Sequence, residues 1–170
     1  MSTEQGVGEA LAHPLFSLGF ILLLALAAAS DLQARRIPNP LVAAVALLAL
    51  ANHLLLGGFQ ALLPTLGSAL FFLLVASGLV LLFARNALGA GDVKLLLAAL
   101  LFVGGQRQSS LLLLVALFGG LLAAGYLSLR CLQQGPLGSL AAGRDVTLPY
   151  GVAIASGGIL LAGSDFGWIF

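Results

Sequence analysis

The chain of 170 residues consists largely of apolar side chains: 61% are hydrophobic, 8% are charged, and the mean hydropathy is +1.13. Too few charges are present to cover the surface of a water-soluble protein, so lipid is expected to be the main solvent. The long unbroken apolar runs favour membrane helices over the alternating strands of a barrel. A net charge of +1 without a basic run excludes a nucleic-acid-binding surface. The sequence therefore predicts an all-α, polytopic membrane helix bundle that forms a single domain over residues 1–170.

Disulfide and metal chemistry are not expected. Cys131 is the single cysteine and is interpreted as a small apolar residue, and with His13 and His53 it offers no metal-ligand spacing. We therefore expect neither a metal nor a cofactor. The N-terminal segment carries Glu4 and Glu9 without a basic residue, which favours a retained first helix over a cleaved signal peptide.

About six segments reach or approach the roughly 20 apolar residues that a membrane-spanning helix requires. In chain order they are Leu15–Ser30, Leu41–Leu56, Leu62–Phe83, Leu88–Val103, Ser110–Leu129 and Leu148–Ala162. Proline and glycine residues at the breaks are expected to end helices or form turns. These residues are Pro38, Pro40, Gly57, Gly58, Pro64, Gly104, Gly105, Gly135 and Pro136. The fourth segment has the weakest signal, because it spans only if its polar LGAGDVK stretch is shielded inside protein or faces a water-filled cavity.

The basic residues lie in alternate loops and so indicate an orientation. Arg107 stands alone on one side, and the remaining six fall on the other: Arg35, Arg36, Arg85, Lys94, Arg130 and Arg144. The positive-inside rule makes the side with six basic residues cytoplasmic, so both termini are predicted to lie outside.

Small residues in the last two spans predict close helix packing. The fifth span carries two small-x-x-x-small pairs, Gly119 with Ala123 and Gly120 with Ala124. Gly151 and Ala155 repeat this spacing in the last span, and such pairs allow two helix backbones to approach closely in lipid.

Three acidic residues fall on the predicted cytoplasmic side, and two of them, Asp31 and Asp92, directly adjoin apolar runs. An ionisable group in a span costs about 2.5–3.5 kcal/mol at the bilayer centre and less near the interface, so each is a functional candidate. Structural alternatives stay open: Asp31 can pair with Arg35 at the i, i+4 spacing, and Asp92 can cap the helix that follows it. The third acid, Asp145, lies in a polar loop and is interpreted as a solvated charge.

The neighbours of Asp92 favour a functional interpretation. Gly89 and Gly91 lower helix stability and suit a place where another backbone approaches closely. Lys94 has a structural alternative as an interfacial cation whose stem lies along apolar surface.

Two carboxylates in a shielded cavity titrate as a unit and tend to hold one proton between them, which is the condition for acid–base hydrolysis. The ionised carboxylate removes a proton from water while the protonated one polarises the scissile carbonyl. A helix N-terminus beside Asp92 favours its ionised form, so Asp92 is interpreted as the base and Asp31 as the acid.

The segment Asp31-Leu-Gln-Ala-Arg-Arg36-Ile37-Pro38-Asn39 resembles the first active-site segment of the type IV prepilin peptidases. Gly89-Ala-Gly91-Asp92-Val-Lys94 resembles their second, the GxGD signature, and Pro149-Tyr150-Gly151 resembles a third. The resemblance implies an intramembrane aspartyl endopeptidase that removes the basic leader from prepilins or pseudopilins at the cytoplasmic face of a bacterial or archaeal membrane. Their leader and transmembrane segment, together with membrane lipid, are the implied partners.

By the same resemblance, Asp31 and Asp92 are the catalytic pair, with Gly89, Gly91, Lys94, Arg36, Pro38 and Asn39 in support. Larger family members also carry paired CxxC motifs and N-methylate the product with S-adenosylmethionine. One cysteine and no room for that domain make this chain similar to the short peptidase-only forms of Flp/Tad pilus systems.

Two other functions also fit the composition. In a small proton-coupled transporter or channel, Asp31 and Asp92 would relay protons, but such sites usually lie near mid-membrane within inverted repeats. In a non-catalytic assembly scaffold, both aspartates would act only as caps.

Overall fold

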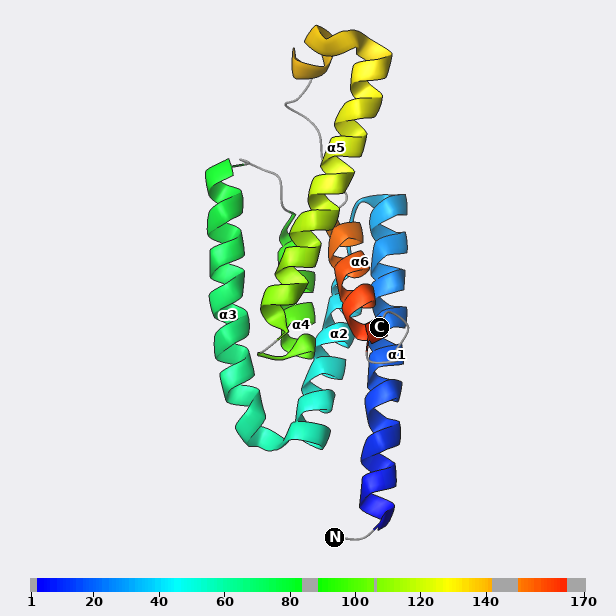
Figure 1. Cartoon of the computed structure of the whole chain (residues 1–170), viewed down its shortest axis with the longest axis vertical. Coiled ribbons are helices and arrows are strands. Elements are labelled where there is room, and N and C mark those ends of the chain that lie inside the picture. The colour runs from blue at the N-terminus through cyan, green and yellow to red at the C-terminus, as the bar shows by residue number, and fades with distance from the viewer. Residues whose placement is uncertain (1–2, 84–88, 106, 142–149, 165–170) are drawn as a thin grey trace.

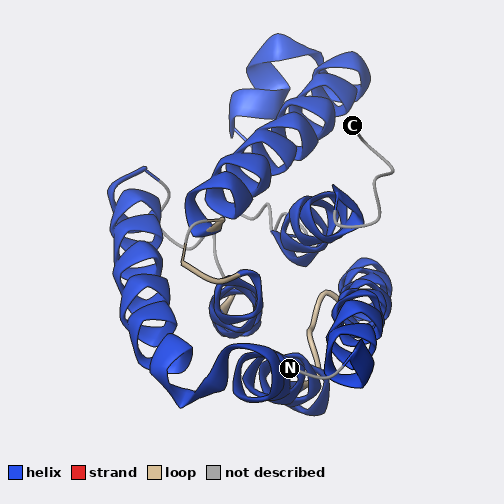
Figure 2. Cartoon of the chain, turned by 60° about the horizontal axis from the view of Figure 1, so that its bottom comes forward, coloured by secondary structure: helices blue, strands red, loops and turns tan. Residues whose placement is uncertain are grey.

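The computed structural model describes residues 3–83, 89–105, 107–141 and 150–164. Within these ranges short turns connect helices and no strand is present, which confirms the all-α prediction (Figures 1 and 2). In chain order the elements are α1 (Thr3–Ala34), α2 (Asn39–Asn52), the π-helical turn η1 (His53–Gly57), α3 (Gly58–Phe83), α4 (Ala90–Val103), α5 (Gln108–Ala141) and α6 (Tyr150–Gly163).

The helices run alternately up and down (Figure 1). The last turn of α1 and the first turns of α2, α4 and α6 all lie at the upper end of the bundle as Figure 1 draws it. The turn between α2 and α3 and the turn between α4 and α5 lie toward the opposite, lower end. One end of the bundle therefore collects the three segments in which the sequence analysis found its motifs.

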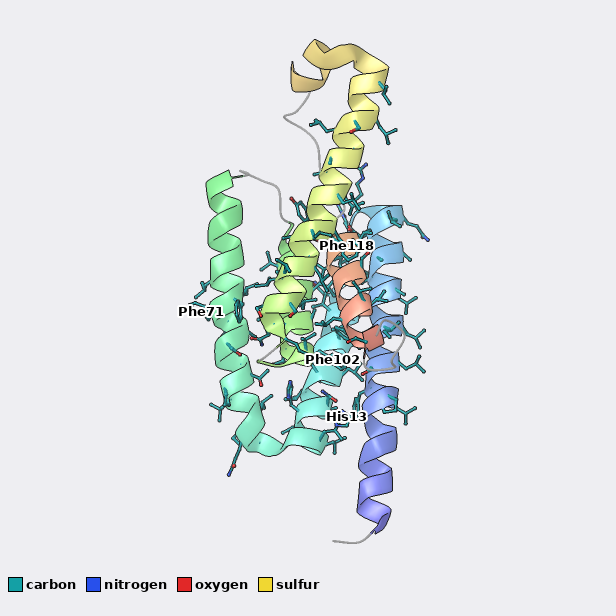
Figure 3. All side chains as sticks on the ribbon, in the orientation of Figure 1. His13, Phe71, Phe102 and Phe118 are labelled. Carbon is teal, nitrogen blue, oxygen red and sulfur yellow. The ribbon has the colours of Figure 1, made fainter. Side chains whose placement is uncertain are left out.

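The core is built around α4, whose side chains are largely buried and which contacts α2, α3, α5 and α6. Phe102 of α4 stacks on Phe20 of α1 with ring centroids 3.9 Å apart, and Figure 3 shows Phe102 inside the bundle. Phe71 on α3, by contrast, is largely exposed. A helix of 14 residues is about 21 Å long, shorter than the hydrocarbon core of a bilayer, so shielding by its neighbours is what keeps α4 at membrane depth.

Small residues bring α6 close to two other helices. A Cβ added to Gly158 would collide with Leu24 of α1, and one added to Gly157 would lie 3.3 Å from Val115 of α5. Gly119 of α5 lies beside Tyr150 of α6, as the small-residue spacing predicts. Gly120, in contrast, has no atom near its added Cβ, so the prediction of a second packing pair in α5 is wrong at this position.

Polar side chains tie the lower end together. The buried side-chain amide of Gln108, at the start of α5, donates hydrogen bonds to the carbonyl oxygens of Leu100 at 3.0 Å and of Thr65 at 3.3 Å. His53 Nε2 lies 2.6 Å from the carbonyl oxygen of Leu101. These contacts join η1, α3, α4 and α5 at the end of the bundle opposite the sequence motifs.

Several prolines and glycines end helices or form turns, as the sequence predicts. Pro38 is the extended residue before α2, and Gly104, with φ of 80°, ends α4. Gly57 and Gly58 mark the reversal between α2 and α3, although the chain stays helical there through η1.

Two predicted breaks are wrong. Pro64 lies inside α3, and α5 continues through Gly135 and Pro136. Proline within a helix can kink it without ending it, and the ribbon turns sharply near the end of α5 in Figure 1.

Three described helical segments are long and apolar enough to cross a membrane: His13–Ala34, Asn39–Leu56 and Gln108–Leu129. Leu62–Leu74 and Tyr150–Gly163 are shorter apolar helices. Large apolar side chains on the outer faces of these helices are exposed, among them Leu22, Leu47 and Leu113. Such faces require lipid, and the chain is a helical membrane bundle.

Candidate active site

Asp31 lies in the last turn of α1 with only 5% of its surface exposed. Its Oδ2 atom is buried and has no hydrogen-bond partner among the described residues. Leaving a buried polar atom unpaired costs about 1–3 kcal/mol, and an unpaired carboxylate costs more. A site that holds such an oxygen is a candidate for chemistry.

The chain turns away from Asp31 within a few residues. Arg35 adopts a left-handed backbone with φ of 49°, and its N–H donates to the carbonyl oxygen of Asp31 at 2.9 Å. Ser30 Oγ donates to the carbonyl oxygen of Arg36 at 2.8 Å and so ties the turn back to the helix. The exposed side chain of Arg36 lies at the end of the bundle that holds Asp31.

The next residues start α2. The carbonyl oxygen of Pro38 accepts the N–H groups of Leu41 at 3.0 Å and Val42 at 3.3 Å, which is the pattern of a helix start. Pro38 has an extended backbone with φ of −62° and ψ of 132°, and the preceding residue, Ile37, is half-buried beside the site.

Asp92 occupies the third position of α4. Its Oδ2 accepts a hydrogen bond from the backbone N–H of Gly89 at 3.1 Å, the carboxylate half of a capping box. The capping interpretation of Asp92 is therefore present in the structure. The other carboxylate oxygen of Asp92 takes no part in this hydrogen bond.

Three effects act on the charge of Asp92: burial, the hydrogen bond from Gly89, and the negative charge of Asp31. Burial and the negative charge of Asp31 disfavour a negative charge on Asp92, whereas the hydrogen bond from the Gly89 N–H favours it. The two carboxylates are thus close enough for the charge of Asp31 to act on Asp92.

Ile37 lies against two glycines, Gly151 beside Asp31 and Gly91, which directly precedes Asp92. A Cβ added to Gly151, in the first turn of α6, would lie 2.7 Å from Asp31 Oδ2 and 3.0 Å from Ile37 Cδ1. One added to Gly91 of α4 would lie 3.5 Å from Ile37 Cβ and 3.8 Å from its backbone N and O. The close backbone approach predicted for Gly91 is therefore present, and its partner is the Ile37 segment.

Lys94 and Asn39 form a polar contact beside the site. Lys94 Nζ donates to Asn39 Oδ1 at 3.4 Å and so links the second turn of α4 to the first turn of α2, with both side chains exposed. The competing acid, Asp145, and Pro149 of the third motif lie outside the described residues.

The structure thus gathers Asp31, Asp92, Gly89, Gly91 and Lys94 with the Arg36–Asn39 segment at one end of the bundle. Sequence reasoning missed two contacts. Ile37 was quoted only as part of a motif, and Gly151 was assigned to helix packing and to the third motif rather than to the space around Asp31. The sequence signal for both contacts was that Ile37 and Gly151 lie within segments that resemble family motifs.

The arrangement can support acid–base chemistry, because one buried carboxylate presents an unpaired oxygen and a second carboxylate lies nearby on the first turn of another helix. Backbone N–H groups at the start of α4 also favour negative charge in this region.

Comparison with protein families matches residues 18–126 to the Type IV leader peptidase family. The matched region is more than half of the chain and contains Asp31, the Arg36–Asn39 segment and the Gly89–Lys94 motif. It ends before α6, so the contact of Gly151 with Asp31 is a feature of the structure beyond the match. Comparison with curated proteins and with solved structures gave no match. The chain belongs to the type IV leader peptidase family.

Proposed function

We propose that this membrane peptidase is an intramembrane aspartyl endopeptidase that removes the basic leader from prepilin-like substrates. Family membership supports a leader peptidase with prepilin-type substrates in general. The aspartyl mechanism, the cytoplasmic side of cleavage, the absence of methyltransferase activity and a single peptidase domain over residues 1–170 are parts of the proposal.

The unpaired, buried Oδ2 of Asp31 is the observation that carries the aspartyl mechanism. It lies beside Gly151 in the first turn of α6, and the charge of Asp31 acts on Asp92. A carboxylate that served only as a helix cap or a surface ion pair would not need this burial. A proton-relay path would instead place acids near the middle of the membrane. Asp31 belongs to the last turn of α1 and Asp92 to the first turn of α4, and these two turns lie at one end of the bundle (Figure 1).

In the proposed reaction the two carboxylates hold one proton between them. Asp92, which accepts the Gly89 N–H and lies at a helix start, is the ionised base that takes a proton from the attacking water. Asp31 donates its proton to the carbonyl oxygen of the scissile peptide bond as the water oxygen bonds to the carbonyl carbon. Collapse of the tetrahedral intermediate then breaks the C–N bond: the carbonyl re-forms as one hydroxyl proton returns to Asp31, and the proton held by Asp92 passes to the leaving amine.

The proposal is tested with purified protein in detergent and a prepilin that carries its leader. We expect leader removal by the wild type and a loss of at least about 10³-fold in kcat for Asp31→Asn and for Asp92→Asn, the scale seen when one member of a catalytic unit is removed. A folded variant of either aspartate that cleaves at the wild-type rate would refute the pair.

Asp145→Asn serves as the matched control, because it removes an acid expected on the same side of the membrane while leaving the pair intact. We expect it to remain active. Mass spectrometry of the product in the presence of S-adenosylmethionine tests the second part of the proposal: an added methyl group would show that the chain is not a peptidase alone.

A further inference from the structure

A cavity of about 550 Å³ lies at the end of the bundle opposite the aspartates. Its lining comes from α1, α2, η1, α4 and α6, together with Arg107 in the turn before α5. Phe102 and Ala162 are buried in this lining, whereas His13 and Arg107 are exposed. Figure 3 shows His13 below Phe102, toward the lower end of the bundle. The cavity therefore has a polar mouth and an apolar interior.

The cavity lies where the membrane-spanning segments end. Of the three described segments that are long and apolar enough to cross a bilayer, the first begins at His13 and the second ends at Leu56, and both residues line the cavity. The third begins at Gln108, directly after Arg107. The ends of spanning helices lie where the hydrocarbon core gives way to the lipid headgroups. The polar mouth is therefore at the depth of the headgroups, on the predicted outer side of the membrane.

The polar lining residues are suited to a single negative charge. Arg107 is the one formal cation among the described residues that line the cavity, and none of those residues is acidic. A guanidinium group presents several N–H donors in one plane and can bind two phosphate oxygens at once. His13 and the half-buried Asn52 carry further groups that can donate hydrogen bonds. An anion in this cavity meets donors without facing a carboxylate of the described lining.

Two of the polar residues are held in place by contacts of their own. His53 Nε2 lies 2.6 Å from the carbonyl oxygen of Leu101, and because a carbonyl oxygen only accepts, Nε2 donates and the ring is fixed against α4. The backbone N–H of Arg107 donates to the carbonyl oxygen of Gly104 at 3.3 Å, and its own carbonyl oxygen accepts the N–H of Leu111 at 3.0 Å. A site whose walls are ordered beforehand loses less conformational freedom when a ligand binds.

We propose that this cavity binds the singly charged phosphate of an anionic phospholipid headgroup. Arg107 holds the phosphate oxygens at the mouth, and the apolar interior, with Phe102 and Leu161, contacts the start of the acyl chains. Free phosphate offers the same charged group, but it would fill a small part of the volume and leave the apolar lining without a partner. The site is separate from the aspartate pair, and the proposal does not depend on the peptidase mechanism.

Native mass spectrometry of the protein purified in detergent tests the site, with phosphatidylglycerol and phosphatidylcholine of the same acyl chains as probes. Both lipids carry a phosphate diester, but choline adds a fixed positive charge that a lining without an acid does not balance. We expect each chain to retain one phosphatidylglycerol with an affinity at least about 10-fold above that for phosphatidylcholine. Arg107→Gln should weaken phosphatidylglycerol binding by about 10-fold or more, because a charge-assisted contact is lost.

Arg130→Gln is the matched control, because it removes the same charge from α5 about 33 Å along the helix from Gln108, at 1.5 Å per residue. We expect it to bind phosphatidylglycerol as the wild type does. An equal loss in the two arginine variants, or equal retention of the two lipids by the wild type, would overturn the site. Thermal unfolding in detergent shows that each variant is folded, and if Arg107→Gln is not, Asn52→Leu replaces it and should weaken binding several-fold.

Inorganic phosphate distinguishes the lipid from a free anion. At millimolar concentration, and against sodium chloride at the same ionic strength, it should not displace phosphatidylglycerol from the wild type. Displacement would overturn the lipid headgroup as the ligand and assign the cavity to a free anion.

Discussion

Asp31 and its surroundings are tightly fitted at the residue scale. One of its oxygens is buried without a hydrogen-bond partner among the residues that the structure describes, and Gly151 approaches it so closely that only hydrogen fits in the position of a side chain. Ile37 borders the same position, since its Cδ1 would lie 3.0 Å from a Cβ added to Gly151. An unpaired buried oxygen costs stability, so its retention is best explained by a role in which water or substrate becomes its partner.

Gly151→Ala is predicted to disable the site. The added Cβ would lie 2.7 Å from Asp31 Oδ2, so either the carboxylate or α6 must move. Overpacking of this kind costs about 1–3 kcal/mol, and a misplaced catalytic group can cost about 10²-fold in rate. Leader cleavage by the variant, measured alongside its thermal unfolding in detergent, checks the prediction.

Gly120→Ala is the control, because the space around its added Cβ is empty. We expect this variant to keep wild-type activity and to gain slightly in helix stability. Wild-type cleavage by Gly151→Ala would mean that Asp31 does not need its observed position.

At the scale of elements, local sequence rules located much of the structure. Pro38 starts α2, Gly104 ends α4, and Asp92 caps the helix that it begins, because each depends on backbone geometry within a few residues. Pro64 and Pro136 show where such rules fail. Both remain inside helices, since tertiary packing and a lipid environment that penalises free amides can offset the loss of one hydrogen bond.

The position of α6 depends on Gly158, whose missing side chain lets α6 lie against Leu24 and Phe20 of α1. Gly158→Ala is expected to push α6 away from α1, to destabilise the protein by about 1–3 kcal/mol and, because α6 carries Gly151, to lower activity. Unfolding in detergent and leader cleavage measure the two effects.

The control is Gly163, on the same helix, where an added Cβ meets no atom within 4 Å. Gly163→Ala should therefore change neither the stability of the protein nor its rate of leader cleavage. If both variants behaved alike, the close packing of α6 on α1 would not determine the site.

At the scale of the whole molecule, the convergence of α1, α4 and α6 was only partly predictable. The orientation rule placed Asp31 and Asp92 on one side of the membrane, and motif resemblance linked them. That Gly151 would face Asp31, or that Ile37 would lie between the two glycines, depends on how helices distant in sequence pack, which no local pattern encodes.

The predicted orientation can be checked with exposed positions at opposite ends of the bundle. In a Cys131→Ser background, Gln60→Cys in α3 should react from outside intact cells with a membrane-impermeant maleimide, because its end carries one basic residue. Ala34→Cys, at the Asp31 end, should react only after the membrane is opened. The reverse pattern would place the aspartates outside.

The central claim, that Asp31 and Asp92 act as one catalytic unit, is tested most directly by the rate of leader cleavage in a double-variant cycle. If the pair acts as a unit, Asp31→Asn, Asp92→Asn and the double variant should all fall to the same residual rate, because removing either member already abolishes the shared mechanism. A single variant that retains the wild-type rate, or losses that multiply in the double variant, would contradict it.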